Sequence, residues 1–212
     1  MTIDRAALPF VLVAALPALA ALVFGSGGIA AGLLVLPAAV ALFFRDPERS
    51  PPAGRELVLA PADGTVMHAG PARPGEAPAG RWLQVTIFLS LFDVHINRTP
   101  VAGRVTDVRL VPGAYLPAFR PDAHWNEHSE IRLDHDGVEV VTRQVVGVLA
   151  RRVVCRVRVG DELGPGDRIG LMKFGSRMDV FLPEPARVRV ARGDHVRGGE
   201  TVIAEFGPRA TP

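Results

Sequence analysis

The feature that most constrains this chain is an almost wholly apolar amino-terminal segment, from Ala6 to Phe44, interrupted only by Gly25-Ser26-Gly27-Gly28. Its two halves, "ALPFVLVAALPALAALVF" and "IAAGLLVLPAAVALFF", are 18 and 16 residues long. A straight helix needs about 20 apolar residues to cross a bilayer. The segment therefore predicts a helical hairpin with a Gly-rich turn that dips into or just crosses a membrane.

Positive charge flanks this segment on both sides, with Arg5 before it and Arg45 and Arg49 after it. Because cytoplasmic flanks are rich in Lys and Arg, both ends of the hairpin are expected on the cytoplasmic side of the cell inner membrane. A cleaved signal peptide ending near 18–20, "ALA", would explain only the first half. A buried soluble hairpin is disfavoured because neither half has a polar face.

Bulk charge and cysteine content exclude several classes of function. The net charge is only +2. Lys173 is the only lysine among 24 basic residues, which indicates a general preference for arginine in this sequence. The slight excess of basic residues is therefore weak evidence for a nucleic-acid partner. No basic run or aromatic pattern predicts binding to nucleic acid. The single cysteine, Cys155, excludes an internal disulfide and a thiolate-rich metal cluster.

Beyond residue 45 the composition changes to short runs of Val, Ile and Leu separated by Gly, Pro and Asp. Strands at this spacing, with almost no helical periodicity, predict an all-β, barrel-sandwich-like domain over 46–212 after a membrane-associated hairpin over 1–45. The predicted strands are 57–59, 64–68, 82–89, 103–111, 130–133, 138–146, 153–159, 167–172, 178–182, 186–190 and 201–206.

Two Gly-Asp turns of similar composition, "GDELGPGDRIG" at 160–170 and "RGDHVRGGETV" at 192–202, suggest one alternative function. They resemble turns of the biotinyl and lipoyl carrier domains, which display a lysine at a hairpin tip. The stretch "LMKFGS" puts Lys173 near such a tip, so a membrane-tethered carrier is a hypothesis. The residues flanking Lys173 do not match those domains, which are about half this size.

The pair Gly175-Ser176, between two apolar runs, carries the second hypothesis. A serine after glycine can attack the glycine carbonyl and cut its own chain if a base takes the hydroxyl proton and another group orients that base. Asp63 in "PADGTV" and His95 in "FLSLFDVHINRTPVAGRV" are candidates for these partners. Taken alone, Asp63 is an ordinary turn residue and His95 an ordinary strand-end residue.

Taken in order, several stretches resemble one family, the phosphatidylserine decarboxylases, in particular the short form of bacteria and archaea. The matching stretches are "FFRDPER", "PADGTV", "FLSLFDVHINRTPVAGRV", the "NEH" at 126–128 and "RIGLMKFGSRMDVFLP". They cover about residues 44–207, and their order makes the resemblance specific although no single stretch is.

The resemblance implies a precursor that cleaves itself between Gly175 and Ser176, leaving a large chain and a small chain of 37 residues, 176–212. It implies that Ser176 becomes a covalent pyruvoyl group, which binds the substrate's amine as a Schiff base and accepts the electrons released with carbon dioxide. It also implies a self-cleavage triad of Ser176, His95 as base and Asp63 as orienter, with His95 a proton donor in decarboxylation.

The sequence departs from the longer bacterial members at one point. Those members carry two histidines three residues apart, whereas this chain has His95 and then Arg98. Either His95 serves both steps, or Arg98 has taken another task, such as holding the lipid phosphate or carboxylate. The family pattern also makes Asn126 and Glu127 candidates for lining the lipid site.

The stretch "HWNEH" at 124–128 spells H-x-x-E-H, the motif of one class of zinc peptidases, and gives a third hypothesis. Zinc binding at this spacing needs one helix that presents both histidines. Pro117 and Pro121 precede the motif, a strand-like run follows at Glu130, and no third ligand is evident. We expect a loop here and no bound metal.

The favoured interpretation is a self-processing, pyruvoyl-dependent phospholipid decarboxylase that makes phosphatidylethanolamine from phosphatidylserine. Its expected partners are the phospholipid substrate, the membrane and the two chains cut from one precursor. No nucleic acid is expected, and a homodimer is left open. A lipid substrate whose acyl chains stay in the bilayer is consistent with the apolar amino-terminal segment.

Overall fold

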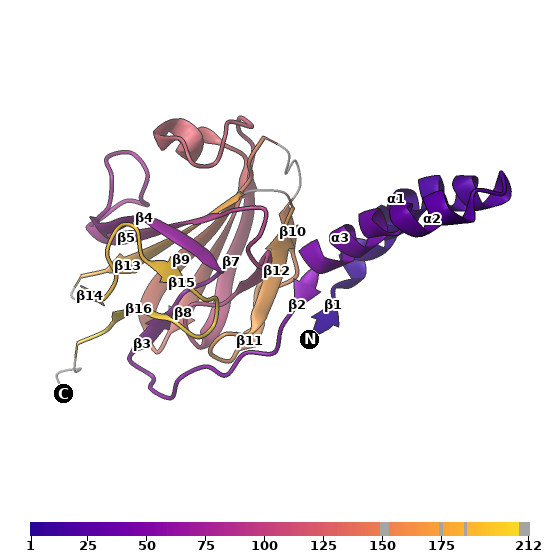
Figure 1. Cartoon of the computed structure of the whole chain (residues 1–212). Coiled ribbons are helices and arrows are strands. Elements are labelled where there is room, and N and C mark those ends of the chain that lie inside the picture. Colours follow the sequence, from indigo (N-terminus) through magenta and orange to yellow (C-terminus); the bar gives the residue numbers. More distant parts are fainter. Residues whose placement is uncertain (149–152, 174–175, 185, 208–212) are drawn as a thin grey trace. The chain divides into compact units, whose positions relative to one another are not determined.

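The computed structural model describes residues 1–148, 153–173, 176–184 and 186–207. The chain divides into two compact units, Met1–Glu48 and Arg49–Pro212 (Figure 1). The functional division, with an anchor over 1–45 and a catalytic part over 46–212, stays a prediction.

The first unit is a helical hairpin, as predicted. A short antiparallel pair, Thr2 opposite Asp46 and Ile3 opposite Arg45, closes its base. Gly25, with φ of +74°, makes the turn after the first arm, and glycine adopts this backbone conformation without strain. The elements are β1 (Thr2–Ile3), η1 (Arg5–Ala7), α1 (Leu8–Val23), α2 (Gly27–Leu33), α3 (Val35–Phe43) and β2 (Arg45–Asp46).

The first arm, Arg5–Val23, is long and apolar enough to cross a membrane by length and composition. Only 11% of its most apolar window is buried inside the structure, unlike the core helix of a soluble protein. The second arm, Gly27–Phe43, is shorter. Exposed leucines and valines along both arms leave a large apolar surface that water solvates poorly.

The second unit is built on an antiparallel eight-stranded sheet that curls into a half-barrel, as the β-rich prediction requires (Figure 1). The strand order is β11-β7-β8-β9-β13-β5-β4-β15. The strands are β4 (Gly64–Pro71), β5 (Trp82–Leu89), β7 (Gly103–Val111), β8 (His128–His135), β9 (Val138–Val145), β11 (Glu162–Leu163), β13 (Ser176–Pro183) and β15 (His195–Val196).

Two three-stranded sheets and one short helix complete the second unit. The 3-10 helix η2 (Pro121–Trp125) lies in the connection from β7 to β8. The first small sheet has the order β10 (Val153–Cys155), β12 (Arg168–Met172), β6 (Ile96–Arg98), and the second the order β14 (Arg187–Val188), β16 (Val202–Glu205), β3 (Leu57–Leu59).

The core lies against one face of the large sheet, because side chains alternate between faces along a strand. On β13, Met178 and Val180 point to the core, opposite Ile87 and Val85 of β5, and all four are fully buried. The other face of β13 carries charged residues beginning with Arg177, which is also buried. Both faces of this central strand are therefore covered, and its polar residues are buried along with its apolar ones.

Two strand boundaries differ from the sequence expectation in ways that matter for the site. Strand β13 begins at Ser176, two residues before the predicted 178, because its pairing with β5 continues to Leu89. Strand β6, Ile96–Arg98, was not predicted, since three residues are too few to show an alternating pattern. Its pairing with β12 is a tertiary contact.

Candidate active site

Ser176 is the first residue of the central strand β13, which pairs with β5 on one side and β9 on the other. It lies opposite Leu89, the last residue of β5, and is fully buried. Gly175, the other half of the predicted cleavage pair, lies outside the described residues. The sheet thus holds the serine rigidly at one strand end.

The hydroxyl of Ser176 is buried and makes no hydrogen bond with any residue that the structure describes. Two nearby side chains, Asn97 and Gln144, also carry a buried polar atom that makes no hydrogen bond among the described residues. Gln144 Nε2 donates to Asn97 Oδ1 at 2.8 Å, and within the described part of the chain Gln144 Oε1 and Asn97 Nδ2 have no hydrogen-bond partner. Gln144 lies opposite Met178 and so on the same face of the sheet as Ser176. Unsatisfied buried polar atoms are costly, so their accumulation here marks a functional region.

His95 directly precedes β6 and is buried. Its backbone oxygen accepts a hydrogen bond from Met172, the last residue of β12, at 3.2 Å, so it lies beside the strand that leads to Ser176. Its ring Nδ1 is 2.9 Å from the backbone oxygen of Asp93. A proton on Nδ1 would donate to that oxygen and leave Nε2 as the basic nitrogen, the tautomer that a general base needs.

Asp63 directly precedes β4, and the strand order β13-β5-β4 brings it to the same sheet end as Ser176. Its Oδ2 accepts from Arg49 Nη2 at 2.7 Å and its Oδ1 from the backbone N–H of Gly198 at 2.8 Å. Gly64, with φ of +151°, permits the close approach of β4 to β5, since a Cβ there would be 2.1 Å from the oxygen of Phe88.

The segments that carry Asp63 and His95 also run side by side. The backbone N–H of Arg98 donates to the oxygen of Pro61 at 2.8 Å, two residues before Asp63. The structure thus gathers the segments of all three predicted triad residues at one end of the sheet. In this structure His95 Nδ1 faces the Asp93 oxygen, and the two Asp63 carboxylate oxygens accept from Arg49 and Gly198. The hydrogen bond by which Asp63 would orient His95 stays a prediction and would compete with these contacts.

Arg98 is buried, and its Nη1 donates to the backbone oxygen of Gly166 at 2.9 Å. Its stem packs against Gly199, where an added Cβ would be 2.9 Å from Arg98 Cδ. Gly199 is the neighbour of Gly198, which donates to Asp63. These contacts give Arg98 a structural task beside Asp63, and its predicted contact with the substrate stays a prediction.

Asn126 and Glu127 anchor the loop between β7 and β8. The Asn126 amide donates to the oxygens of Leu116 and Val146 and accepts from the N–H of Leu116, each at 2.8 Å. Glu127 Oε2 accepts from the hydroxyl of Tyr115 at 2.9 Å. Because Val146 follows Val145, which lies opposite Arg177, the loop is tied beside the start of β13. Lipid binding by these two residues stays a prediction.

The H-x-x-E-H stretch does not form the single helix that a zinc site of this type requires. His124 lies in η2, whereas His128 is the first residue of β8. Their Nδ1 atoms are each 2.9 Å from a backbone oxygen, of Pro121 and Asn126 respectively. Across the described residues, no group of three or more His, Cys, Asp or Glu could hold a metal ion. The zinc hypothesis is not supported.

A buried ionic cluster lies on the opposite face of β13, directly after Ser176. Arg177 Nη2 is 2.7 Å from Glu76 Oε2, and its Nε is 2.9 Å from Asp179 Oδ1. Thr86 and Gln84 complete the cluster, donating to Asp179 at 2.7 Å and to Glu76 at 2.8 Å. Burial alone would lower the pKa of Arg177, but the two carboxylates outweigh it and raise this pKa. Sequence analysis missed this cluster, because Glu76 is remote in sequence.

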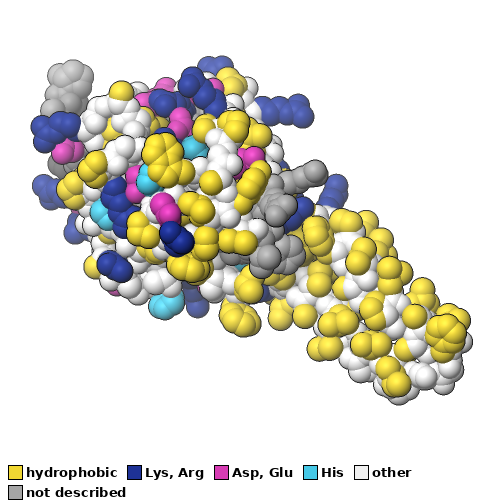
Figure 2. Space-filling view, turned by 90° about the horizontal axis from the view of Figure 1, so that it is seen from above, with side chains coloured by type: hydrophobic (Ala, Val, Ile, Leu, Met, Phe, Trp, Pro, Cys, Tyr) yellow, Lys and Arg dark blue, Asp and Glu magenta, His cyan; other side chains and the backbone are white. Residues whose placement is uncertain are grey.

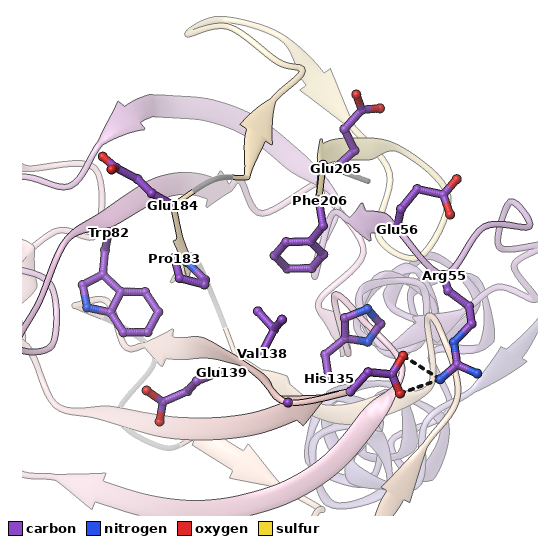
Figure 3. Close-up of a pocket in the computed structure, with 13 residues that line it drawn as sticks. Arg55, Glu56, Trp82, His135, Val138, Glu139, Pro183, Glu184, Glu205 and Phe206 are labelled. Carbon is purple, nitrogen blue, oxygen red and sulfur yellow. Dashed lines mark hydrogen bonds and ion pairs between the residues drawn. The ribbon is translucent and has the colours of Figure 1, made fainter. Parts of the chain in front are cut away.

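A pocket of about 1040 Å³ lies at the other end of the sheet (Figure 3). Trp82 and Pro183 line it, and these residues end β5 and β13 opposite to Leu89 and Ser176. Seven residue steps of about 3.3 Å separate the two strand ends by about 23 Å. The pocket therefore does not contain the candidate active site.

Comparison with known proteins agrees with the resemblance in the sequence. The family model described as phosphatidylserine decarboxylase matches residues 36–204. A phosphatidylserine decarboxylase proenzyme of Symbiobacterium thermophilum is 46% identical over 210 residues, covering 96% of this chain and 95% of the relative. The proenzyme of Chlorobium chlorochromatii is 46% identical over 77% of each chain, and that of Geotalea uraniireducens 40% identical over 92% of each.

Proposed function

Because this chain belongs to the phosphatidylserine decarboxylase family, we propose that it is a proenzyme that cuts itself before Ser176 and then converts phosphatidylserine to phosphatidylethanolamine and carbon dioxide. The observation that carries the proposal is Ser176 itself. It begins a central strand, it is buried, and its hydroxyl has no hydrogen-bond partner within the described structure.

Self-cleavage is the first step of the proposal. The Ser176 hydroxyl oxygen attacks the Gly175 carbonyl carbon, its proton passes to His95, and the acyl group moves from nitrogen to oxygen as an ester. Loss of the α-proton then breaks the Cβ–Oγ bond and frees the Gly175 carboxylate. Tautomerisation and addition of water release ammonia and leave a pyruvoyl group at the new end of the small chain.

The residues around Ser176 fit such a group. Its carbonyls need hydrogen-bond donors, and the buried amide nitrogen Asn97 Nδ2 is a donor without a partner among the described residues. Gln144 holds the other side of the Asn97 amide by donating to Oδ1. The pyruvoyl group supplies an electrophilic ketone for the substrate's amine and a sink for the electrons released with carbon dioxide. His95 would hold the proton that returns to the substrate carbon. The remaining roles are those that the resemblance implies. Asp63 would orient His95, and Arg98 would hold the lipid phosphate or carboxylate. Asn126 and Glu127 would line the lipid site.

The apolar amino-terminal unit would place this chemistry at the membrane. Arg5 and Arg45 flank the hairpin, which favours a cytoplasmic catalytic unit at the inner membrane. The hypothesis of a carrier that displays Lys173 is not supported by the comparisons, whose matching relatives are decarboxylase proenzymes.

Intact-protein mass spectrometry tests the proposal most directly. We expect two fragments split after Gly175, the smaller one bearing a pyruvoyl terminus, and a Ser176→Ala variant that stays a single chain of 22.6 kDa. Ser129→Ala is the matched control, because Ser129 is another buried serine of the same sheet and this variant should still cleave. An intact wild-type chain that nevertheless decarboxylates phosphatidylserine would refute the pyruvoyl mechanism.

A further inference from the structure

Exposed large hydrophobic side chains of the second unit are concentrated at one end of the sheet. Among its described residues, eight are exposed, and Val159 is the exception to this clustering because it lies near the start of β7. We call the other seven the apolar rim: Leu91, Phe92, Leu110, Tyr115, Phe119, Trp125 and Val148.

The first part of the apolar rim lies in the loop between β5 and β6. Leu91 and Phe92 follow Leu89, the residue opposite Ser176, by two and three positions. His95 comes only three residues after Phe92. Phe92 is 88% exposed, although Leu89 before it and His95 after it are buried. This loop therefore carries exposed apolar side chains between the residue opposite Ser176 and His95.

The second part lies in the loop that contains η2. The ring of Phe119 packs edge-on against Phe88, with 6.1 Å between centroids, and Phe88 lies opposite Arg177. Trp125 ends η2 and is 68% exposed. It directly precedes Asn126, whose amide ties the loop to Val146 at the end of β9. Val148 is two residues beyond that point.

The third part comes from β7, where Leu110 lies opposite Ser129, one residue from the start of β8. The seventh residue, Tyr115, lies in the same loop as η2, and its hydroxyl donates to Glu127. All seven residues thus lie near the sheet end that carries Ser176. Figure 2 looks down on the molecule from the side of η2 and shows hydrophobic side chains on this face among basic, acidic and His side chains. Large hydrophobic side chains that gather at one end of a fold, with polar residues between them, are a common feature of surfaces that bind a protein or a membrane.

We propose that the apolar rim inserts into the surface of a phospholipid bilayer around the entrance to the site. This inference rests on the proposed function, because a lipid substrate keeps its acyl chains in the bilayer while its headgroup must reach Ser176. Four of the seven side chains are Phe, Tyr or Trp. Aromatic rings of this kind are favoured at the boundary between lipid and water.

The two tryptophans provide an internal test, because Trp125 belongs to the apolar rim and Trp82 lines the pocket at the other sheet end. Full-length Trp82→Phe and Trp125→Phe variants each retain one of them. With vesicles of anionic phospholipid carrying brominated acyl chains, we expect strong quenching of Trp125 fluorescence and little quenching of Trp82. Equal quenching of the two, or none of Trp125, would overturn the proposal. Shielding of Trp125 without lipid would indicate contact with a second copy instead.

A kinetic test separates this inference from the proposed function. The double variant Phe92→Ser, Trp125→Ser should lose at least about tenfold in kcat/KM toward phosphatidylserine in vesicles, since two aromatic insertions are removed. Its activity on a monomeric, short-chain phosphatidylserine should equal that of the wild type. Val159→Ser, a control that is also exposed but lies near the start of β7, should change neither.

An equal loss on both substrates would show that the two aromatic residues act on the site itself, and would contradict membrane insertion. No loss on vesicles would contradict it as well. If the wild type decarboxylates neither substrate, the proposed function fails, and the tryptophan quenching experiment still decides whether the apolar rim binds lipid.

Discussion

His95 is the residue whose chemistry is most open to test. It is buried, its ring Nδ1 faces the oxygen of Asp93, and its backbone binds the end of β12. As the base of self-cleavage it should be replaceable by glutamine without loss of fold, but cleavage should slow by about 10²–10⁴-fold. A time course of fragment formation measures this rate.

His135 provides the control for that experiment. It is buried as well, and its Nδ1 lies 2.6 Å from the oxygen of Ala102, but it lines the pocket at the opposite end of the sheet. His135→Gln should therefore cleave at nearly the wild-type rate. Similar slowing in both variants would show a general effect on folding and would remove the case for His95 as base.

Arg177 should contribute strongly to stability because it neutralises two buried carboxylates, Glu76 and Asp179. Arg177→Met removes the short ion pairs of both carboxylates and leaves Glu76 with the longer pair to Arg73, at 3.8 Å. We expect a loss of about 3–5 kcal/mol in the free energy of unfolding. Arg55→Met is the matched control, since Arg55 pairs with Asp136 at the surface and should contribute less than about 1 kcal/mol. Urea unfolding of the Ser176→Ala background checks both values, and equal losses would refute the expectation.

Acid should destabilise the fold through His128 and Glu130. Burial lowers the pKa of His128 below 6.5. Burial opposes ionisation of Glu130, but hydrogen bonds and charges from Arg143 and Arg132 outweigh it and hold this pKa below 4.5. In both cases the unfolded chain binds more protons than the folded chain as pH falls, so stability decreases.

The contribution of His128 should be complete above about pH 6.5 and decline as pH falls through the lower folded pKa, and that of Glu130 should decline only below about pH 4.5. Unfolding free energies measured from about pH 7 to 5 should therefore fall with acid. The fall should be shallower in a His128→Gln variant. An unchanged slope in that variant would mean that other groups dominate the acid response.

At the scale of elements, the loop around η2 depends on one side chain. Asn126 makes three hydrogen bonds that join this loop to itself and to the end of β9. Asn126→Leu leaves those backbone groups without partners, at about 1–3 kcal/mol for each buried group. We expect faster hydrogen exchange over 113–127, while β8 and β9 keep their protection.

Asp122→Ala is a suitable control for that measurement, because Asp122 lies in the same loop but forms an exposed pair with Arg120. Its exchange should be close to that of the wild type. If Asn126→Leu leaves exchange over the loop unchanged, the Asn126 amide does not hold the loop. Its predicted role in lining the lipid site would then better explain why an asparagine is found at this position.

At the scale of the whole molecule, self-cleavage should not separate the two products. The small chain would contain β13, which pairs with β5 and β9, together with β15 and β16, which pair with β4 and β3. Its strands are therefore held on several sides by the large chain. Size-exclusion chromatography in mild detergent should give one peak that contains both fragments, and only denaturant should resolve them. Separation without denaturant would contradict this interleaved arrangement.

Much of the architecture follows from local patterns that the sequence displays. The two apolar halves around the Gly-rich turn predict the hairpin, because an unbroken apolar helix has nowhere else to bury its surface. Alternating runs such as 82–89 predict strands, because their side-chain period of two matches a sheet with one buried face. The ordered motifs around Asp63, His95 and Ser176 indicate the family and the chemistry, which the family match confirms at the level of the enzyme class.

The sequence by itself determined most of the elements, their kind and the reaction class, since these depend on neighbouring residues and on motif identity. Only the tertiary structure decided that Ser176 begins a central strand, that Glu76 reaches Arg177, and that the exposed aromatic side chains collect at the same sheet end. Strand order and loop placement bring together residues that are far apart along the chain. Such contacts depend on how a sheet closes, and no local pattern encodes this closure.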